Sequence, residues 1–171
     1  PKWVRAYVAA LIDNHASLVV SVARAKNRAL GYRPKQELRY KSDKAPVRDL
    51  LTQYCVAYEI DPRITDQSGS TYPRFTFELS ARRDLVAFLT PLRPYLRVQD
   101  RAVTLLIETL IPGLDAGAHS DPEAFLAWTQ YLDAFREAAG RANRHKYDHD
   151  YFRVEFDVAV PPNPADAFAG V

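Results

Sequence analysis

Basic side chains are concentrated in one short part of the chain. Residues 24–48 contain nine Lys or Arg and only two acidic residues, whereas residues 106–171 contain five basic and eleven acidic residues. The Arg guanidinium matches the geometry of phosphate oxygens and of guanine edges. This charge asymmetry favours a polyanion as the ligand of the N-terminal part. The alternative is a solvated basic face that contacts no ligand.

Alternation of polar and apolar residues predicts that the basic stretch forms a β-hairpin. Residues 17–24 and 35–41 have the pattern of strands, and residues 27–34, with Gly31 and Pro34, have the composition of a turn region. The second strand would turn Lys35, Glu37, Arg39 and Lys41 outward. The candidate nucleic-acid-binding residues are Arg24, Lys26, Arg28, Tyr32, Arg33, Lys35, Arg39, Lys41, Lys44, Arg48 and Arg74.

The remaining pattern predicts helices around a second hairpin. We expect a helix over residues 2–12 that stops at Asp13-Asn14, and a second helix that Asp43 caps. A hairpin over residues 60–65 and 72–79 and a helix from 80 or 81 to 92 complete the order α-β-β-α-β-β-α. Two further helices follow, over residues 100–111, ending at Pro112-Gly113, and from Ser120-Asp121 to Gly140. The fold class is therefore α+β, with a four-stranded antiparallel saddle and C-terminal helices.

Composition excludes several classes of protein. The longest apolar runs are far shorter than the 18 residues of a membrane-spanning helix, so no membrane association is expected. A single cysteine, Cys55, excludes an intrachain disulfide, and with four scattered histidines it argues against a closed zinc site. We therefore expect no cofactor and no metal. The absence of methionine is explained either by a removed initiator or targeting segment or by trimming.

The element order and two segments resemble the LAGLIDADG homing endonucleases, in particular their single-motif, homodimeric branch typified by algal chloroplast intron enzymes. Residues 7–17 read YVAALIDNHAS, and residues 88–97 read FLTPLRPYLR, similar to the family segment Phe-Leu-x-x-Leu-x-Pro-Phe-Leu-Lys. The resemblance covers residues 3–144. It implies a homing-endonuclease-like domain over 1–144 and a C-terminal extension over 145–171, whose end from Val158 to Val171 is expected to be extended.

The resemblance also implies which positions would carry catalysis. At two of these three positions, the residue in this chain differs in type from the family's residue. The family holds divalent metal with an acidic residue at the end of the first helix, and the matching position is His15. The position of the family's basic helper is Gln99, and its polar, water-organising residue falls near Asp43 or Lys44. Imidazole is a poor ligand for Mg²⁺. We therefore expect no catalytic residues, His15, Asp43 and Gln99 being degenerate positions, and a structural role for Asp13.

The resulting hypothesis is a catalytically inactive, domesticated LAGLIDADG-type protein that binds structured RNA. The positions that match base-reading side chains are Ser21, Ala23 and Ala25, which are too short to reach base edges. The expected partners are rRNA and the neighbouring proteins of an organellar ribosome, in the mitochondrion or alternatively the chloroplast. We expect a monomer at the helix face formed by Ala6, Ala9 and Ala10. The alternatives are an active homodimeric DNA endonuclease and a protein-binding adaptor.

Overall fold

The structure is a computed structural model that describes residues 1–67, 74–140 and 145–156. Its element order confirms the α+β class and the αββαββα arrangement. The first seven elements are α1 (Lys2–His15), β1 (Ala16–Arg24), β2 (Tyr32–Ser42), α2 (Ala45–Ala57), β3 (Arg63–Gln67), β4 (Arg74–Leu79) and α3 (Arg82–Leu89). After them come η1 (Thr90–Tyr95), α4 (Asp100–Leu105), η2 (Leu106–Leu110), α5 (Ile111–Asp115), η3 (Ala118–Ser120), α6 (Pro122–Ala138) and α7 (His149–Glu155).

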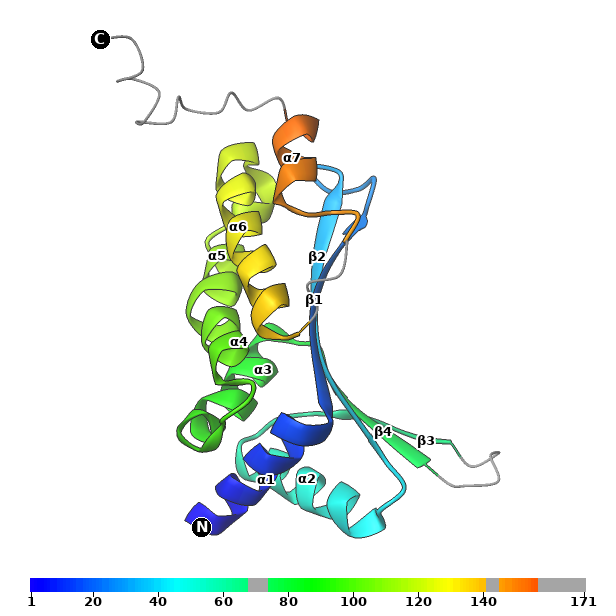
Figure 1. Cartoon of the computed structure of the whole chain (residues 1–171). Coiled ribbons are helices and arrows are strands. Elements are labelled where there is room, and N and C mark those ends of the chain that lie inside the picture. Colours follow the sequence, from blue (N-terminus) through cyan, green and yellow to red (C-terminus); the bar gives the residue numbers. More distant parts are fainter. Residues whose placement is uncertain (68–73, 141–144, 157–171) are drawn as a thin grey trace, which may run out of the picture.

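The four strands form one antiparallel sheet in the order β1-β2-β4-β3. The β1–β2 hairpin is much the longer, pairing Ala16 with Tyr40 at one end and Arg24 with Tyr32 at the other. Among the described residues, β4 pairs with β2 only from Leu38 to Ser42. The far half of the hairpin therefore extends beyond the other two strands, and there the second edge of β2 carries no strand (Figure 1).

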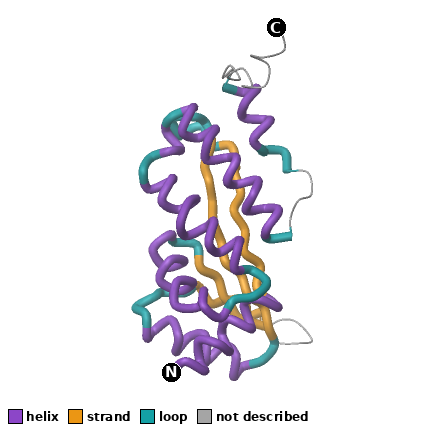
Figure 2. The backbone as a smooth tube through the Cα atoms, turned by 60° about the vertical axis from the view of Figure 1, so that its left-hand side comes forward, coloured by secondary structure: helices purple, strands orange, loops and turns teal. Residues whose placement is uncertain are grey.

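The helices cover one face of this sheet and leave the other uncovered (Figures 1 and 2). The buried residues of β1, β2 and β4 lie at alternate positions, as in the run Phe75, Phe77 and Leu79 of β4, and in β2 Pro34 and Gln36 of the same set are half-buried. These side chains join one apolar cluster with α3, α4 and α6. Because successive side chains in a strand point to opposite faces, burying one set necessarily exposes the other. We call the uncovered side of the sheet the open face.

Several helix boundaries differ from the sequence-based expectation. The helix expected to reach residue 92 ends at Leu89, where the 3₁₀ helix η1 begins. Helix α1 continues to His15, because Asn14 donates its side-chain N–H to the Ala10 carbonyl at 2.7 Å and keeps the last turn closed. Helix α2 has Lys44 as its N-cap, and Asp43 makes an ion pair with the Lys44 ammonium instead of capping. The helix expected to end at Pro112 continues to Asp115. The wider π-helical turn η2 comes just before Pro112, which has no backbone N–H to donate to the helix.

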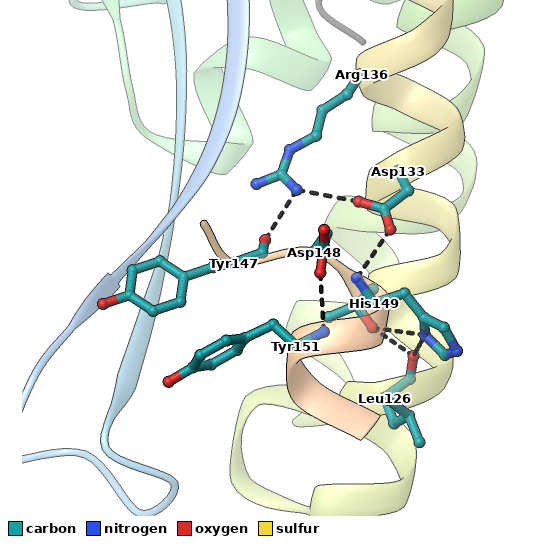
Figure 3. A network of polar contacts seen from close by, with 8 residues as sticks. Leu126, Asp133, Arg136, Tyr147, Asp148, His149 and Tyr151 are labelled. Carbon is teal, nitrogen blue, oxygen red and sulfur yellow. Dashed lines mark hydrogen bonds and ion pairs between the residues drawn. The ribbon is translucent and has the colours of Figure 1, made fainter. Parts of the chain in front are cut away.

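The first part of the expected C-terminal extension packs into the same core. Helix α7 lies against α6, and its Phe152 side chain is fully buried beside Tyr32 and Phe125. The segment that leads into α7 is held by Arg136 of α6, which donates to the Asp133 carboxylate at 3.0 Å and to the Tyr147 carbonyl at 2.9 Å (Figure 3). Residues 158–171, expected to be extended, lie outside the described residues.

No helix in the described parts of the chain combines the length and the apolar character that crossing a bilayer requires.

The packing of α7 gives a first prediction. Phe152→Ala should lower the free energy of unfolding by about 3–5 kcal/mol, because it empties a fully buried aromatic site. The matched control on the same helix is Val154→Ala, whose side chain is 76% exposed and should change stability by less than about 0.5 kcal/mol. Urea denaturation followed by tryptophan fluorescence measures both. Equal effects of the two substitutions would mean that α7 does not belong to the folded core.

Candidate nucleic-acid interface

The open face carries most of the free positive charge of the sheet. Strand β2 contributes Arg33, Lys35, Glu37, Arg39 and Lys41, which alternate with buried residues. The register places Glu78 of β4 opposite Arg39, and Arg63 of β3 opposite Glu78. The outward side chains on the described strands therefore include Ser17, Val19, Ser21, Ala23, Arg33, Lys35, Glu37, Arg39, Lys41, Arg63, Thr65, Arg74, Thr76 and Glu78.

The cations of the open face are not equivalent. The Arg39 guanidinium lies 2.7 Å from Glu37 and 3.4 Å from Glu78, so two carboxylates neutralise it. By contrast, Lys35, Lys41 and Arg74 form no ion pair with another described residue. These three remain available to phosphate. Lys35 lines a hollow of about 460 Å³ on the open face, together with Ser21, Arg39 and Glu78, whereas Lys41 and Arg74 line another cavity at the end of α1.

Two residues of the candidate set face the helices instead. Tyr32 is only 3% exposed, and its hydroxyl contacts the Tyr151 hydroxyl and donates to the Glu155 carboxylate, each at 2.8 Å. Burial and these hydrogen bonds raise the pKa of the Tyr32 phenol. Arg24 donates to the Tyr151 hydroxyl at 3.0 Å and lies 3.6 Å from Glu155. The place of Tyr32 in the strand thus puts its ring on the covered face among the helices and not on the open face.

The other candidates lie outside the open face. Lys26 and Arg28 are exposed in the hairpin loop, which is closed by hydrogen bonds from the Ala25 amide to Gly31 and from the Gly31 amide to Arg28. At the opposite end, Lys44 lies 3.5 Å from Asp43, and Arg48 lies 3.3 Å from Asp66 and 3.4 Å from Asp49. Arg63, which the sequence analysis did not select, lies on the open face. Its alternation with Thr65 in a short exposed strand was the only signal for it.

The end of α1 opens into a cavity of about 490 Å³ that is lined by two of the three degenerate positions and not by Gln99. His15 and Asp43 line it together with the cations Lys41, Lys44 and Arg74. The His15 ring lies edge-on to Tyr40, with 6.4 Å between ring centroids. Asp43, the one carboxylate among the described lining residues, is already paired with Lys44. We call this hollow the α1 cavity.

These residues do not fit a divalent metal. Mg²⁺ prefers several oxygen ligands, of which carboxylates supply the compensating charge. The α1 cavity offers one engaged carboxylate and an imidazole, and three nearby cations would repel the ion. No cluster of three or more His, Cys, Asp or Glu suited to a metal occurs within the described part of the chain. The same surroundings attract an anion.

Gln99 and Asp13 hold the end of α1 in place. The Gln99 side-chain amide donates to the Ile12 carbonyl at 2.8 Å and to the Ala16 carbonyl at 3.2 Å. The Asp13 carboxylate accepts from the backbone N–H groups of Arg97 at 2.6 Å and Gln99 at 2.9 Å. Gln99 thus ties the last turn of α1 to the first residue of β1. Its contacts are structural, and so are those of Asp13, as the sequence indicated.

The outer face of α1 is apolar and exposed. Trp3 is 67% exposed and Tyr7 is 49% exposed, and Ala6 and Ala10 lie beside them on the exposed side of the helix. Ala9, which we had expected on the same face, is fully buried in its own chain. The face available to a partner is therefore built from Trp3, Ala6, Tyr7 and Ala10.

No protein-family model and no curated protein matches this sequence. Solved structures do match it. An archaeal intron-encoded homing endonuclease, I-Vdi141I, solved with DNA, matches with a TM-score of 0.72 and 18% identity over 91% of this chain and 95% of that chain. The homing endonuclease I-CvuI in complex with its target gives a TM-score of 0.71 and 14% identity over 93% of this chain and 98% of that chain.

The group I intron-encoded homing endonuclease I-CeuI, solved with DNA, has a TM-score of 0.69 and 17% identity over 88% of this chain and 74% of that chain. The match also extends to I-LtrWI, a LAGLIDADG homing endonuclease bound to target DNA, at a TM-score of 0.65 over 78% of this chain and 44% of that chain. At identities this low, the structural match shows a shared fold and nothing about activity. The same fold recurs in each of these proteins. The chain has the fold of the LAGLIDADG homing endonucleases.

Proposed function

We propose that this protein binds nucleic acid on its open face and does not cleave it. The observation that carries the proposal is the α1 cavity, where Lys41, Lys44 and Arg74 surround His15. In such surroundings a phosphate can be bound directly by cationic side chains, with no metal ion between them. Lys35 and Arg33 continue the positive surface along the hairpin.

The lack of cleavage follows from the same lining. Metal-dependent hydrolysis of a phosphodiester needs an ion that polarises phosphate oxygens and activates water. Among the described residues that line the α1 cavity, only Asp43 has a carboxylate, and it is paired with the Lys44 ammonium. Gln99 is committed to the α1 backbone and cannot supply a proton-accepting base. What remains is a site that can bind phosphate without promoting its reaction.

Recognition is proposed to depend on the nucleic-acid backbone and shape. Ser21 and Ala23 lie on the open face and do not extend far enough to contact base edges. Arg39, which could reach a guanine, is held between Glu37 and Glu78. Phosphate contacts position a ligand without reading its sequence. This combination favours structured RNA, which is recognised mainly by its shape, over a long DNA site. DNA, to which I-Vdi141I and I-CeuI were bound when solved, is the alternative.

The charge distribution supports a place in a larger RNA–protein particle. Helix α6 carries Glu123, Asp133 and Glu137 and covers the sheet on the side opposite the open face (Figure 1). Like charge near phosphate is repulsive, so this layer would face away from RNA. A neighbouring protein would then cover Trp3 and Tyr7. We propose that the particle is a mitochondrial ribosome, with the chloroplast ribosome as the alternative, and that the chain is present as a monomer.

Incubation with Mg²⁺ or Mn²⁺ over a randomised plasmid library should give no specific double-strand cuts. His15→Asp should raise metal affinity, because it adds a carboxylate to the α1 cavity, yet should still not cleave, because Gln99 remains engaged. Sequencing of linearised products measures cleavage, and calorimetry measures metal binding. Specific cuts by the unsubstituted protein that disappear in His15→Ala would refute the proposal.

A triple substitution of Lys35, Lys41 and Arg74 by Ala should reduce the salt dependence of binding. If each side chain contacts one phosphate of a single-stranded segment, the slope of log K against log salt should fall by about two. The matched control replaces Lys2, Arg101 and Arg153 by Ala. It removes the same amount of positive charge, but from positions outside the open face. Fluorescence anisotropy with labelled RNA at several salt concentrations measures the slope of log K against log salt. Competition by unlabelled RNA or duplex DNA measures the preference between the two nucleic acids. A larger loss in the control would place the binding surface elsewhere.

Sedimentation of organelle lysate tests the cellular assignment. At moderate salt the protein should co-migrate with ribosome-sized RNA particles, and ribonuclease treatment should move it to lighter fractions. The control is a matrix enzyme that stays at the top of the gradient in both cases. Sedimentation as a free dimer of about twice the 19.4 kDa chain mass would contradict both the proposed particle and the proposed monomeric state.

A further inference from the structure

A second cation-lined hollow lies at the free edge of β2, separate from the α1 cavity. Residues 32–37 of β2 extend beyond β4, and β2 contacts α3 and η3. A cavity of about 160 Å³ lies between them. Its lining residues are Arg28, Tyr32, Arg33, Pro34, Gln36, Arg82, Leu114 and His119. We call it the edge cavity.

The polar groups of the edge cavity converge from three distant parts of the chain. Arg28 comes from the hairpin loop, Arg82 from the first residue of α3, and His119 from η3. Arg28 and Arg33 make no ion pair with any residue that the structure describes. The described lining contains three guanidinium groups and no carboxylate. Such a local excess of positive charge attracts an anion.

His119 gives a second, independent indication of a missing ligand. Its Nδ1 atom is buried and has no hydrogen-bond partner among the described residues. A buried polar atom without a partner is uncommon in native proteins and is often explained by a bound water or ion. In this location, next to three guanidinium groups, the ion would be negatively charged.

Arg82 uses only part of its guanidinium in an ion pair, so its affinity for an anion can be changed through that pair. One of its terminal nitrogens donates to the Asp115 carboxylate, which belongs to the end of α5. A guanidinium has five N–H donors, so this pair leaves donors for a second oxyanion. Asp115 is outside the cavity lining but close enough to compete for Arg82. Removing its charge should strengthen anion binding, whereas removing Arg82 should weaken it.

We propose that the edge cavity binds a phosphate group of the same nucleic acid that lies on the open face. The edge cavity shares Arg33, Pro34 and Gln36 with the hollow of about 460 Å³ on the open face. A nucleic-acid strand on the open face can therefore place a phosphate around the edge of β2. Several donors arranged around one small volume suit the tetrahedral oxygens of phosphate. The source of the phosphate rests on the proposed function, whereas the affinity of the cavity for phosphate does not.

Inorganic phosphate tests the cavity alone. In NMR titrations of the full chain, the His119 ring signals should shift saturably with phosphate, and the His149 signals, from a ring outside the edge cavity, should not follow the same curve. Arg82→Ala should weaken the apparent affinity about tenfold, the size expected for one charge-assisted contact. The matched control is Arg83→Ala, the exposed neighbour on α3 that does not line the cavity. Asp115→Asn should bind phosphate more tightly.

No saturable shift at His119, or equal affinity of Arg82→Ala and Arg83→Ala, would overturn the site. Labelled RNA then tests the source of the phosphate. Arg82→Ala should reduce the slope of log K against log salt by about one and Arg83→Ala should not. If phosphate binds but the RNA slopes are equal, the assignment to nucleic acid is wrong. If no nucleic acid binds to the unsubstituted chain, the proposed function fails, and the phosphate titration alone decides whether the cavity is an anion site.

Discussion

Burial of a single face of the long β1–β2 hairpin is the constraint on which the rest of this molecule depends. The apolar set that includes Leu18, Val20, Leu38 and Tyr40 must leave water, and the helices supply the surface that covers it. Because side chains alternate strictly, a shift of one residue would bring the basic set into the core, at a large cost in desolvation. The same force that builds the core therefore places Lys35 and Lys41 in solvent together, on one curved surface.

The end of the hairpin that extends beyond β4 is stabilised by α7. The rings of Tyr32 and Phe152 meet edge-to-face with 4.9 Å between their centroids, and Arg24 and Glu155 close the outer side. Arg136 anchors the segment before α7 from a position only 5% exposed, which requires charged and polar partners. Burial lowers the pKa of Arg136, and the Asp133 carboxylate opposes that effect. A hairpin held in this way would lose little conformational entropy on binding the proposed nucleic acid.

The end of α1 combines the shared fold with side chains whose charge is its own. Asp13 and Gln99 fix the junction between α1, β1 and the segment before α4 through four hydrogen bonds. The neighbouring cavity combines His15 with Lys41 and Arg74, so its charge is suited to phosphate and unsuited to a metal ion. Architecture and local chemistry are thus separable. The backbone positions resemble those of the endonucleases with which the chain shares its fold, while the side chains at the helix end set what can be bound.

The sequence by itself determined the element order, the alternation that defines the open face, and the identities of His15 and Gln99. These follow from local periodicity and residue type, which need no knowledge of distant contacts. It did not show that Tyr32 faces α7, that Arg39 lies between two glutamates, or that Arg82 and His119 approach Arg28. Only the tertiary structure decided these, because their partners lie on other elements, in most cases tens of residues away. A strand pattern fixes which face a side chain takes, but the free energy of packing between remote elements decides what covers that face and which charges remain free.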